Sequence, residues 1–179
     1  MVARVADRPI IFSGPMVVAL LAGAKTQTRR LAVNRRGRPT VWHKVKAGDR
    51  LWVRETFATI SPDLVIFRAD LRERGGRAYY VDRHGTALVK WRASIHMPRV
   101  VSRLTLTVVE VRRQFVQDID DGDATAEGAA FRAGPLPPGE GFRRLWESLH
   151  GVRGWRDNPG IIALTFQVDP QNIDAAAGG

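Results

Sequence analysis

The chain has 179 residues, a length that suits one well-buried domain and is short for two. Its apolar content of 44% argues against disorder, and the absence of cysteine excludes disulfides and thiolate metal sites. The formal net charge of +10 favours a partner of negative charge. No stretch is long and apolar enough to span a bilayer, so we expect a cytoplasmic protein with no membrane partner.

The first predicted element is a helix that begins after Ser13 and ends before Gly23. Ser13 suits the N-cap and Pro15 suits the first turn. The apolar stripe of this helix is formed by Met16, Val17, Leu20 and Leu21. A glycine after the last periodic residue is the usual helix terminator, so residues 25–30 are expected to form a structured loop.

Positive charge is concentrated between residues 25 and 54, where ten Lys or Arg residues accompany a single acidic residue, Asp49. A basic stripe of this kind can bind the phosphates of a nucleic acid, with a strong dependence on salt. A solvated surface without a partner is the alternative reading.

Strand signals dominate after residue 30. Alternating, apolar or aromatic stretches occupy residues 50–57, 64–69, 78–81, 104–111 and 161–168. Short strands separated by turns favour a barrel.

The remaining segments are predicted to be turns, a linker, a helix and a tail. We expect a hairpin loop at 72–77, a tight turn at 83–85 and an irregular linker at 133–140. A helix is expected at about 142–150, and residues 171–179 are expected to form a flexible tail.

Residues 23–30 read Gly-Ala-Lys-Thr-Gln-Thr-Arg-Arg. This Gly-x-Lys-x-x-Thr-x-Arg pattern resembles the signature of the ASCH domain, a small RNA-linked β-barrel related in fold to the PUA domain. Residues 8–16, 48–55 and 91–99 resemble blocks of the longer, phage-type ASCH proteins. Residues 123–128 and 155–159 complete the resemblance in the expected order. The resemblance extends over about residues 8–168. It implies an α+β fold, a PUA-like barrel with flanking helices, as one domain over 1–170 with insertions at about 34–40 and 63–89.

The resemblance also implies a catalytic set. In ASCH proteins that hydrolyse 4-acetylcytidine at its exocyclic amide, a lysine, a threonine three residues later and a distant glutamate act together. These positions correspond to Lys25, Thr28 and Glu127. Thr28 would be the nucleophile, Lys25 its base, and Glu127 would move a proton to the leaving amine.

Other readings of these three residues remain open. Lys25 can be a phosphate contact, Thr28 a turn hydroxyl, and Glu127 a surface charge or an ion-pair partner of Arg30. The protein would then be a noncatalytic RNA-binding module that reads a base with residues 25–30. A ribonuclease is a third reading, because a basic surface would serve it equally well.

Aromatic and basic residues next to one another suggest a platform for an unstacked base. The candidate ligand-binding residues, for a modified nucleoside or RNA, are Arg29, Arg30, Arg54, Trp52, Trp91, His96 and Trp155. Core packing is the alternative for the tryptophans, and a satisfied core polar group is the alternative for His96. The four histidines lack paired spacing, and the carboxylates at 118–123 look like a helix start, so no metal or cofactor is expected.

Overall fold

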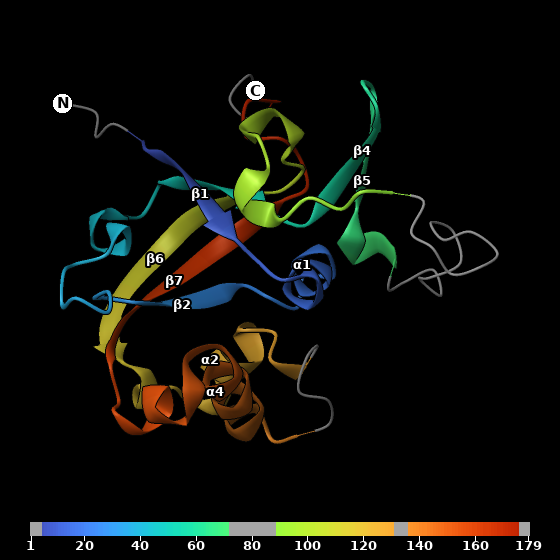
Figure 1. The fold of residues 1–179 in the computed structure, drawn as a ribbon. Coiled ribbons are helices and arrows are strands. Elements are labelled where there is room, and N and C mark those ends of the chain that lie inside the picture. The colour runs from blue at the N-terminus through green and yellow to red at the C-terminus, as the bar shows by residue number, and fades with distance from the viewer. Residues whose placement is uncertain (1–4, 72–88, 131–135, 176–179) are drawn as a thin grey trace.

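The computed structural model describes residues 5–71, 89–130 and 136–175. Its main sheet has five strands in the order β1-β3-β6-β7-β2, and a separate hairpin pairs β4 with β5 (Figure 1). The strands are β1 (Asp7–Ile11), β2 (Gln27–Leu31), β3 (Arg50–Arg54), β4 (Phe57–Ser61), β5 (Leu64–Phe67), β6 (Thr105–Phe115) and β7 (Gly160–Asp169). The fold is therefore a mixture of α and β structure.

The centre of the sheet is the antiparallel pair β6 and β7, which confirms the two long strands expected at 104–111 and 161–168. β7 also pairs with β2, and β3 joins the parallel edge strand β1 to β6. No pairing joins β1 to β2 in the part of the chain that the structure describes, so these strands form an open order and no closed barrel is found. Buried residues of β6 and β7, such as Leu106 and Leu164, form the centre of the core.

The segment expected to be a loop at 25–30 is largely a strand, and this prediction was wrong. β2 pairs antiparallel with β7, with Thr28 opposite Leu164. The sequence of β2, Gln-Thr-Arg-Arg-Leu, is too polar to read as a strand by itself. Pairing with the apolar strand β7 decides its conformation, because strand preference depends on tertiary context.

The predicted first helix is confirmed as α1 (Gly14–Leu21), which starts at Ser13 and is followed by Gly23 at φ 69°. Ser13 occupies the N-cap position, but its side chain makes no capping hydrogen bond. The later helices are α2 (Asp121–Ala126) and α4 (Pro138–Arg156). These two lie side by side below β2 in the view of Figure 1.

The helix expected at about 142–150 is longer than predicted. α4 begins at Pro138, inside the expected linker, and continues to Arg156, with a break at Gly151 where φ is 78°. Pro138 suits a first helical turn because its missing N–H has no partner there in any case. The expected helix start near residue 120 is confirmed, since the Asp120 carboxylate caps α2 by accepting from the Asp123 amide at 2.7 Å.

Short 3-10 turns connect these elements: η1 (Val41–Lys44), η2 (Arg68–Leu71), η3 (Ser94–His96), η4 (Arg99–Val101) and η5 (Val116–Asp118). The strand expected at 64–69 ends at Phe67, where η2 begins. The predictions at 72–77, 78–81 and 83–85 lie outside the described residues, as do residues 131–135 of the chain before α4.

The first residues of the expected flexible tail are held against the sheet. Ile173 is fully buried, and the Asn172 amide donates to the Ser102 carbonyl at 2.7 Å. Arg99 binds Asp174 and Asp7 at 2.6 Å each, which ties this segment to β1. Residues 171–175 thus make specific contacts with the rest of the fold, and the flexibility of residues 171–179 stays a prediction. No helix of the described chain is long and apolar enough to cross a membrane.

Candidate functional site

A pocket of about 640 Å³ lies between β2, the start of α1 and α4, and we call it the β2 pocket. Five of the residues singled out in the sequence line it: Lys25, Thr28, Arg29, Arg30 and Glu127. The structure therefore brings the three expected catalytic residues and two of the expected ligand-binding residues into one cavity.

Backbone hydrogen bonds place Lys25 beside Glu127. After α1 ends, the Lys25 amide donates to the Ala19 carbonyl at 3.0 Å. The next amide, that of Thr26, donates to the Ala126 carbonyl at the end of α2 at 2.9 Å. Two segments about a hundred residues apart in the chain are thereby joined at the pocket.

The Lys25 side chain is almost fully buried, and its ammonium group uses three hydrogen bonds. Nζ donates to the Gln27 carbonyl at 2.7 Å, to the Glu127 carbonyl at 2.8 Å and to Glu127 Oε2 at 2.9 Å. None of the three goes to Thr28. In this arrangement Lys25 fixes Glu127 instead of contacting the expected nucleophile.

Arg29 completes the environment of Glu127 from the other side. Its guanidinium donates to Glu127 Oε1 at 3.1 Å and also forms an ion pair with Asp123. Asp123 in turn accepts from Arg112 at 2.8 Å. Burial opposes the ionisation of Asp123, but hydrogen bonds from Arg112 and Gln27 lower its pKa.

Thr28 and Arg30 share one face of β2, because side chains two residues apart in a strand point the same way. The Arg30 guanidinium donates to Thr28 Oγ1 at 3.1 Å and to the Ile11 carbonyl at 3.0 Å. Its Cζ lies 5.0 Å from the centre of the Phe12 ring and 5.7 Å from that of Trp42. The group in contact with the expected nucleophile is thus an arginine, and it is held in place on several sides.

Three ionisable groups of the pocket have shifted pKa values. Burial lowers the pKa of Arg30, and the charge of Glu127 opposes this effect. Burial lowers the pKa of Lys25, and the nearby Glu127 carboxylate opposes this effect. Burial also lowers the pKa of His150, and the positive charges of Arg30 and Arg35 add to the shift. His150 therefore favours the neutral imidazole in the folded protein.

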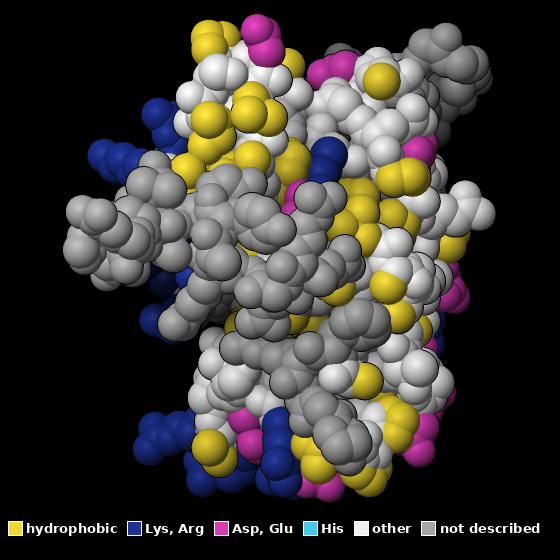
Figure 2. Space-filling view, turned by 90° about the vertical axis from the view of Figure 1, so that its right-hand side faces the viewer, with side chains coloured by type: hydrophobic (Ala, Val, Ile, Leu, Met, Phe, Trp, Pro, Cys, Tyr) yellow, Lys and Arg dark blue, Asp and Glu magenta, His cyan; other side chains and the backbone are white. Residues whose placement is uncertain are grey.

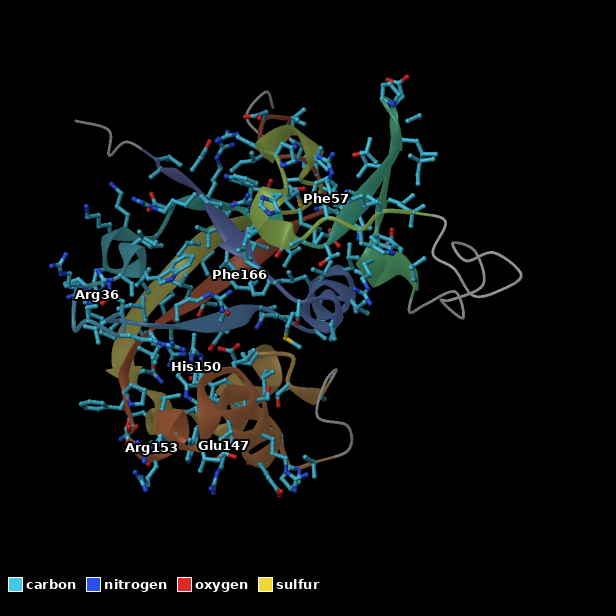
Figure 3. All side chains as sticks on the ribbon, viewed as in Figure 1. Arg36, Phe57, Glu147, His150, Arg153 and Phe166 are labelled. Carbon is cyan, nitrogen blue, oxygen red and sulfur yellow. The ribbon has the colours of Figure 1, made fainter. Side chains whose placement is uncertain are left out.

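Sequence reasoning did not single out the aromatic wall of the pocket. Phe12, Trp42, Trp146 and His150 line it, and the His150 and Trp146 rings lie 4.2 Å apart between centres. Figure 3 shows His150 between β2 and α4, whereas Glu147 and Arg153 of the same helix lie farther from the sheet. Trp42 belongs to no motif, and His150 lies in α4 just before its break at Gly151. Only the tertiary structure brings these two residues together.

The other expected ligand-binding residues lie outside the β2 pocket. Trp52 and Arg54 are close to each other, with Arg54 Cζ 5.3 Å from the Trp52 ring centre, and His96 is exposed nearby in η3. Trp155 packs against the core and lies 6.2 Å from the Phe142 ring. Trp91 is half-buried and does not line the pocket either.

The residues after β2 form an ordered turn with exposed arginines. The Asn34 side chain accepts from the amides of Arg36 at 2.9 Å and Arg38 at 3.1 Å, and Gly37 supplies a φ of 69°. Arg35, Arg36 and Arg38 are exposed, and none has an ion-pair partner among the residues that the structure describes. We call residues 34–39 the basic turn.

The basic turn lies at the left edge of the molecule in Figure 3, where Arg36 is labelled. Figure 2 shows a different face, on which hydrophobic side chains are visible in the upper part and to the right of the centre, and Lys and Arg side chains gather at the left and lower-left edges. Across the described residues, no group of three His, Asp or Glu side chains is arranged to hold a metal ion.

Comparisons with known proteins add little to this site. No protein-family model matches the sequence. No curated protein matches it. Among solved structures, the chain is similar to the crystal structure of protein EF3133 from Enterococcus faecalis V583, of the family DUF984. That similarity covers 97% of this chain and 82% of the other, at 11% identity and a TM-score of 0.45, and it carries no argument about fold or function.

Proposed function

We propose that the protein is an ASCH-type hydrolase, with a PUA-like domain, that cleaves the acyl group from the exocyclic amine of cytidine or of a related modified base. The observation that carries the proposal is that Lys25, Thr28 and Glu127, which the resemblance to ASCH proteins groups as one catalytic set, line one pocket. The pocket is large enough for a nucleoside and has aromatic side chains in its wall, as a flat base requires.

The proposed reaction has two halves. Thr28 Oγ adds to the acyl carbon, and its proton passes to the Glu127 carboxylate. The C–N bond then breaks, the amine of cytosine takes that proton, and an acyl ester remains on Thr28. Water next adds to the ester carbon, gives a proton to Glu127 and releases the carboxylic acid, and the proton returns to Thr28 Oγ.

The surrounding residues have defined parts in this scheme. Lys25 and Arg29 hold the Glu127 carboxylate in one orientation, at 2.9 Å and 3.1 Å. Arg30 donates to Thr28 Oγ1, which stabilises negative charge on that oxygen as its proton leaves. Orientation of this kind is a large part of enzymatic rate enhancement.

The test is the release of cytidine from 4-acetylcytidine by the purified chain, followed by chromatography. Thr28→Val keeps the shape of the side chain and removes the hydroxyl, so we expect turnover to fall by more than about 100-fold. Thr28→Ser keeps a hydroxyl and should retain a measurable part of the activity. Equal turnover by wild type and Thr28→Val would exclude Thr28 as nucleophile, and an inactive wild type would exclude this substrate.

A second candidate function is that of a noncatalytic RNA-binding module. The basic turn favours it, because its three exposed arginines have no carboxylate partner among the described residues. In that case the β2 pocket would recognise a base, and the basic turn would bind the backbone. The two candidates differ in one respect, since only the hydrolase needs the Thr28 hydroxyl for its effect on the ligand.

A further inference from the structure

The β2 pocket has more positive charge than its own carboxylate can balance. Three cationic side chains line it, Lys25, Arg29 and Arg30, against a single carboxylate, that of Glu127. Lys25 and Arg29 are both bound to Glu127, and Arg29 also pairs with Asp123. These two cations are therefore neutralised within the protein.

Arg30 is different. Among the described residues, no carboxylate lies within ion-pair distance of its guanidinium. Its hydrogen bonds go to neutral oxygens only: Thr28 Oγ1 at 3.1 Å, the Arg29 carbonyl at 3.4 Å and the Ile11 carbonyl at 3.0 Å. The Glu127 carboxylate acts on the charge of Arg30 from beyond hydrogen-bond distance, but it is already paired with Lys25 and Arg29. The cavity therefore keeps a positive potential that a bound anion would offset.

The position of Arg30 is also fixed before any ligand binds. The Phe12 and Trp42 rings lie 5.0 Å and 5.7 Å from its Cζ, and the backbone carbonyl of Ile11 holds one nitrogen. A planar guanidinium held in this way can bind two oxygens of a phosphate group and loses little side-chain entropy when it does so.

Two further features place positive potential at the same pocket. Ser13, a lining residue, is the N-cap of α1, and no acidic residue lies in the first turn of that helix. The positive end of the helix dipole is therefore not neutralised by a side chain. Arg35 of the basic turn is close enough to His150, another lining residue, for its charge to help lower the pKa of that imidazole.

We propose that the ligand of the β2 pocket carries a phosphate group and that Arg30 is the residue that binds it. This inference rests on the proposed function, in that the base of the ligand is taken to be a pyrimidine. The favoured substrate is then a nucleotide and not the uncharged nucleoside. The phosphate can belong to a free nucleoside monophosphate or to an internal linkage of RNA, because both present the same charged oxygens.

The experiment measures binding, so that it does not depend on catalysis. Affinities for cytidine, cytidine 5′-monophosphate and a short unstructured cytidine-rich oligoribonucleotide are compared at low salt by calorimetry. The wild type is measured beside Arg30→Gln, Arg30→Lys and the control Arg153→Gln. Arg153 is a suitable control because it is exposed, lies outside the pocket and has no ion pair among the described residues.

We expect the wild type and Arg153→Gln to bind cytidine monophosphate at least about 10-fold more tightly than cytidine. Arg30→Gln should lose this preference and Arg30→Lys should keep part of it. In a nuclear magnetic resonance titration, the bound monophosphate should also raise the pKa of His150, whereas cytidine should not. Tight binding of the oligonucleotide alone, lost in Arg30→Gln, would identify RNA as the source of the phosphate.

Equal affinities for cytidine and its monophosphate in the wild type, with no gain for the oligonucleotide, would overturn the inference. So would a phosphate preference that survives in Arg30→Gln. These failures are distinct from failure of the hydrolase. Cleavage of 4-acetylcytidine and of its monophosphate with equal kcat/KM would support the proposed hydrolysis and refute the proposal that Arg30 binds a phosphate. Tighter binding of the monophosphate without any hydrolysis would support phosphate binding and refute the proposed hydrolysis.

Discussion

Lys25 is a buried charge of the β2 pocket, and its contacts decide how the site is built. Its ammonium group is buried at 1% exposure and is bound by one carboxylate oxygen and two carbonyl oxygens. A buried charge of this kind is tolerated only when its hydrogen bonds are satisfied. Lys25 therefore contributes to stability as well as to any reaction.

Lys25→Met should reduce the free energy of unfolding by about 3–5 kcal/mol, because it leaves the buried Glu127 carboxylate with one of its two cationic partners. Urea unfolding followed by circular dichroism measures the change. Lys46→Met is a matched control at an exposed position and should stay within about 0.5 kcal/mol of wild type. A loss below about 1 kcal/mol for Lys25→Met would mean that the ion pair does not hold the site together.

The sequence predicted the pocket residues unevenly. Lys25 and Thr28 could be singled out because they share a motif of fixed spacing that resembles a known signature, and Glu127 because the same resemblance implies a distant glutamate. The partner of Glu127 could not, since a separation of about a hundred residues carries no local signal. Trp42 and His150 were missed for the same reason, as each becomes part of the site only through packing.

β2 and α2 are the elements that carry the site, and both depend on other elements. β2 is polar and takes its conformation from β7, whereas β6 and β7 alternate or run apolar and could be predicted from their own residues. The short helix α2 ends at Ala126, Glu127 is its C-cap, and Gly128 follows at φ 70°. Segments whose structure is set by distant partners are the ones that sequence patterns describe least well.

Gly128 joins α2 to the pocket at close range. A Cβ added there would lie 3.1 Å from the Cβ atoms of both Ala19 and Lys25. Gly128→Ala should therefore destabilise the protein by about 1–3 kcal/mol and shift Lys25 relative to Glu127. Gly37→Ala is the matched control, because Gly37 has φ 69° but no atom within 4 Å of an added Cβ.

The comparison of these two variants separates backbone strain from packing. In both variants an alanine has to adopt the left-handed backbone conformation, which is unfavourable. Only Gly128→Ala also adds a close contact at the site. Thermal unfolding and turnover of 4-acetylcytidine are measured for each. If Gly128→Ala and Gly37→Ala show equal losses of thermal stability and equal turnover, the contact between Gly128 and Lys25 has no part in positioning the pocket.

At the scale of the whole molecule, the basic residues behind the net charge of +10 lie in different environments. Part of the basic stripe is buried at the pocket, and part is exposed in the basic turn that follows β2. Composition alone could not make this division, because the charges of Arg29 and Arg36 look alike in the sequence. Their burial differs since one is in the sheet and the other is in a turn.

The triple variant Arg35→Gln, Arg36→Gln and Arg38→Gln tests whether the exposed arginines of the basic turn bind RNA. If the basic turn binds a single-stranded backbone, the slope of log affinity against log salt concentration should fall by about 2, since each lost phosphate contact contributes about 0.7. The control carries the same charge change on α4, as Arg143→Gln, Arg144→Gln and Arg153→Gln. Equal slopes for the two triple variants would show that the basic turn does not bind the RNA.

The order of strands in the sheet has a consequence for synthesis of the chain. β2 is made early, yet it pairs with β7, which is made after every other described strand. The β2 segment therefore leaves the ribosome long before β7 has been synthesised, and until then it has no strand to pair with. The pocket can assemble only after β7 has emerged, so a polypeptide that stalls between α2 and β7 contains residues 23–30 but has no β2 pocket.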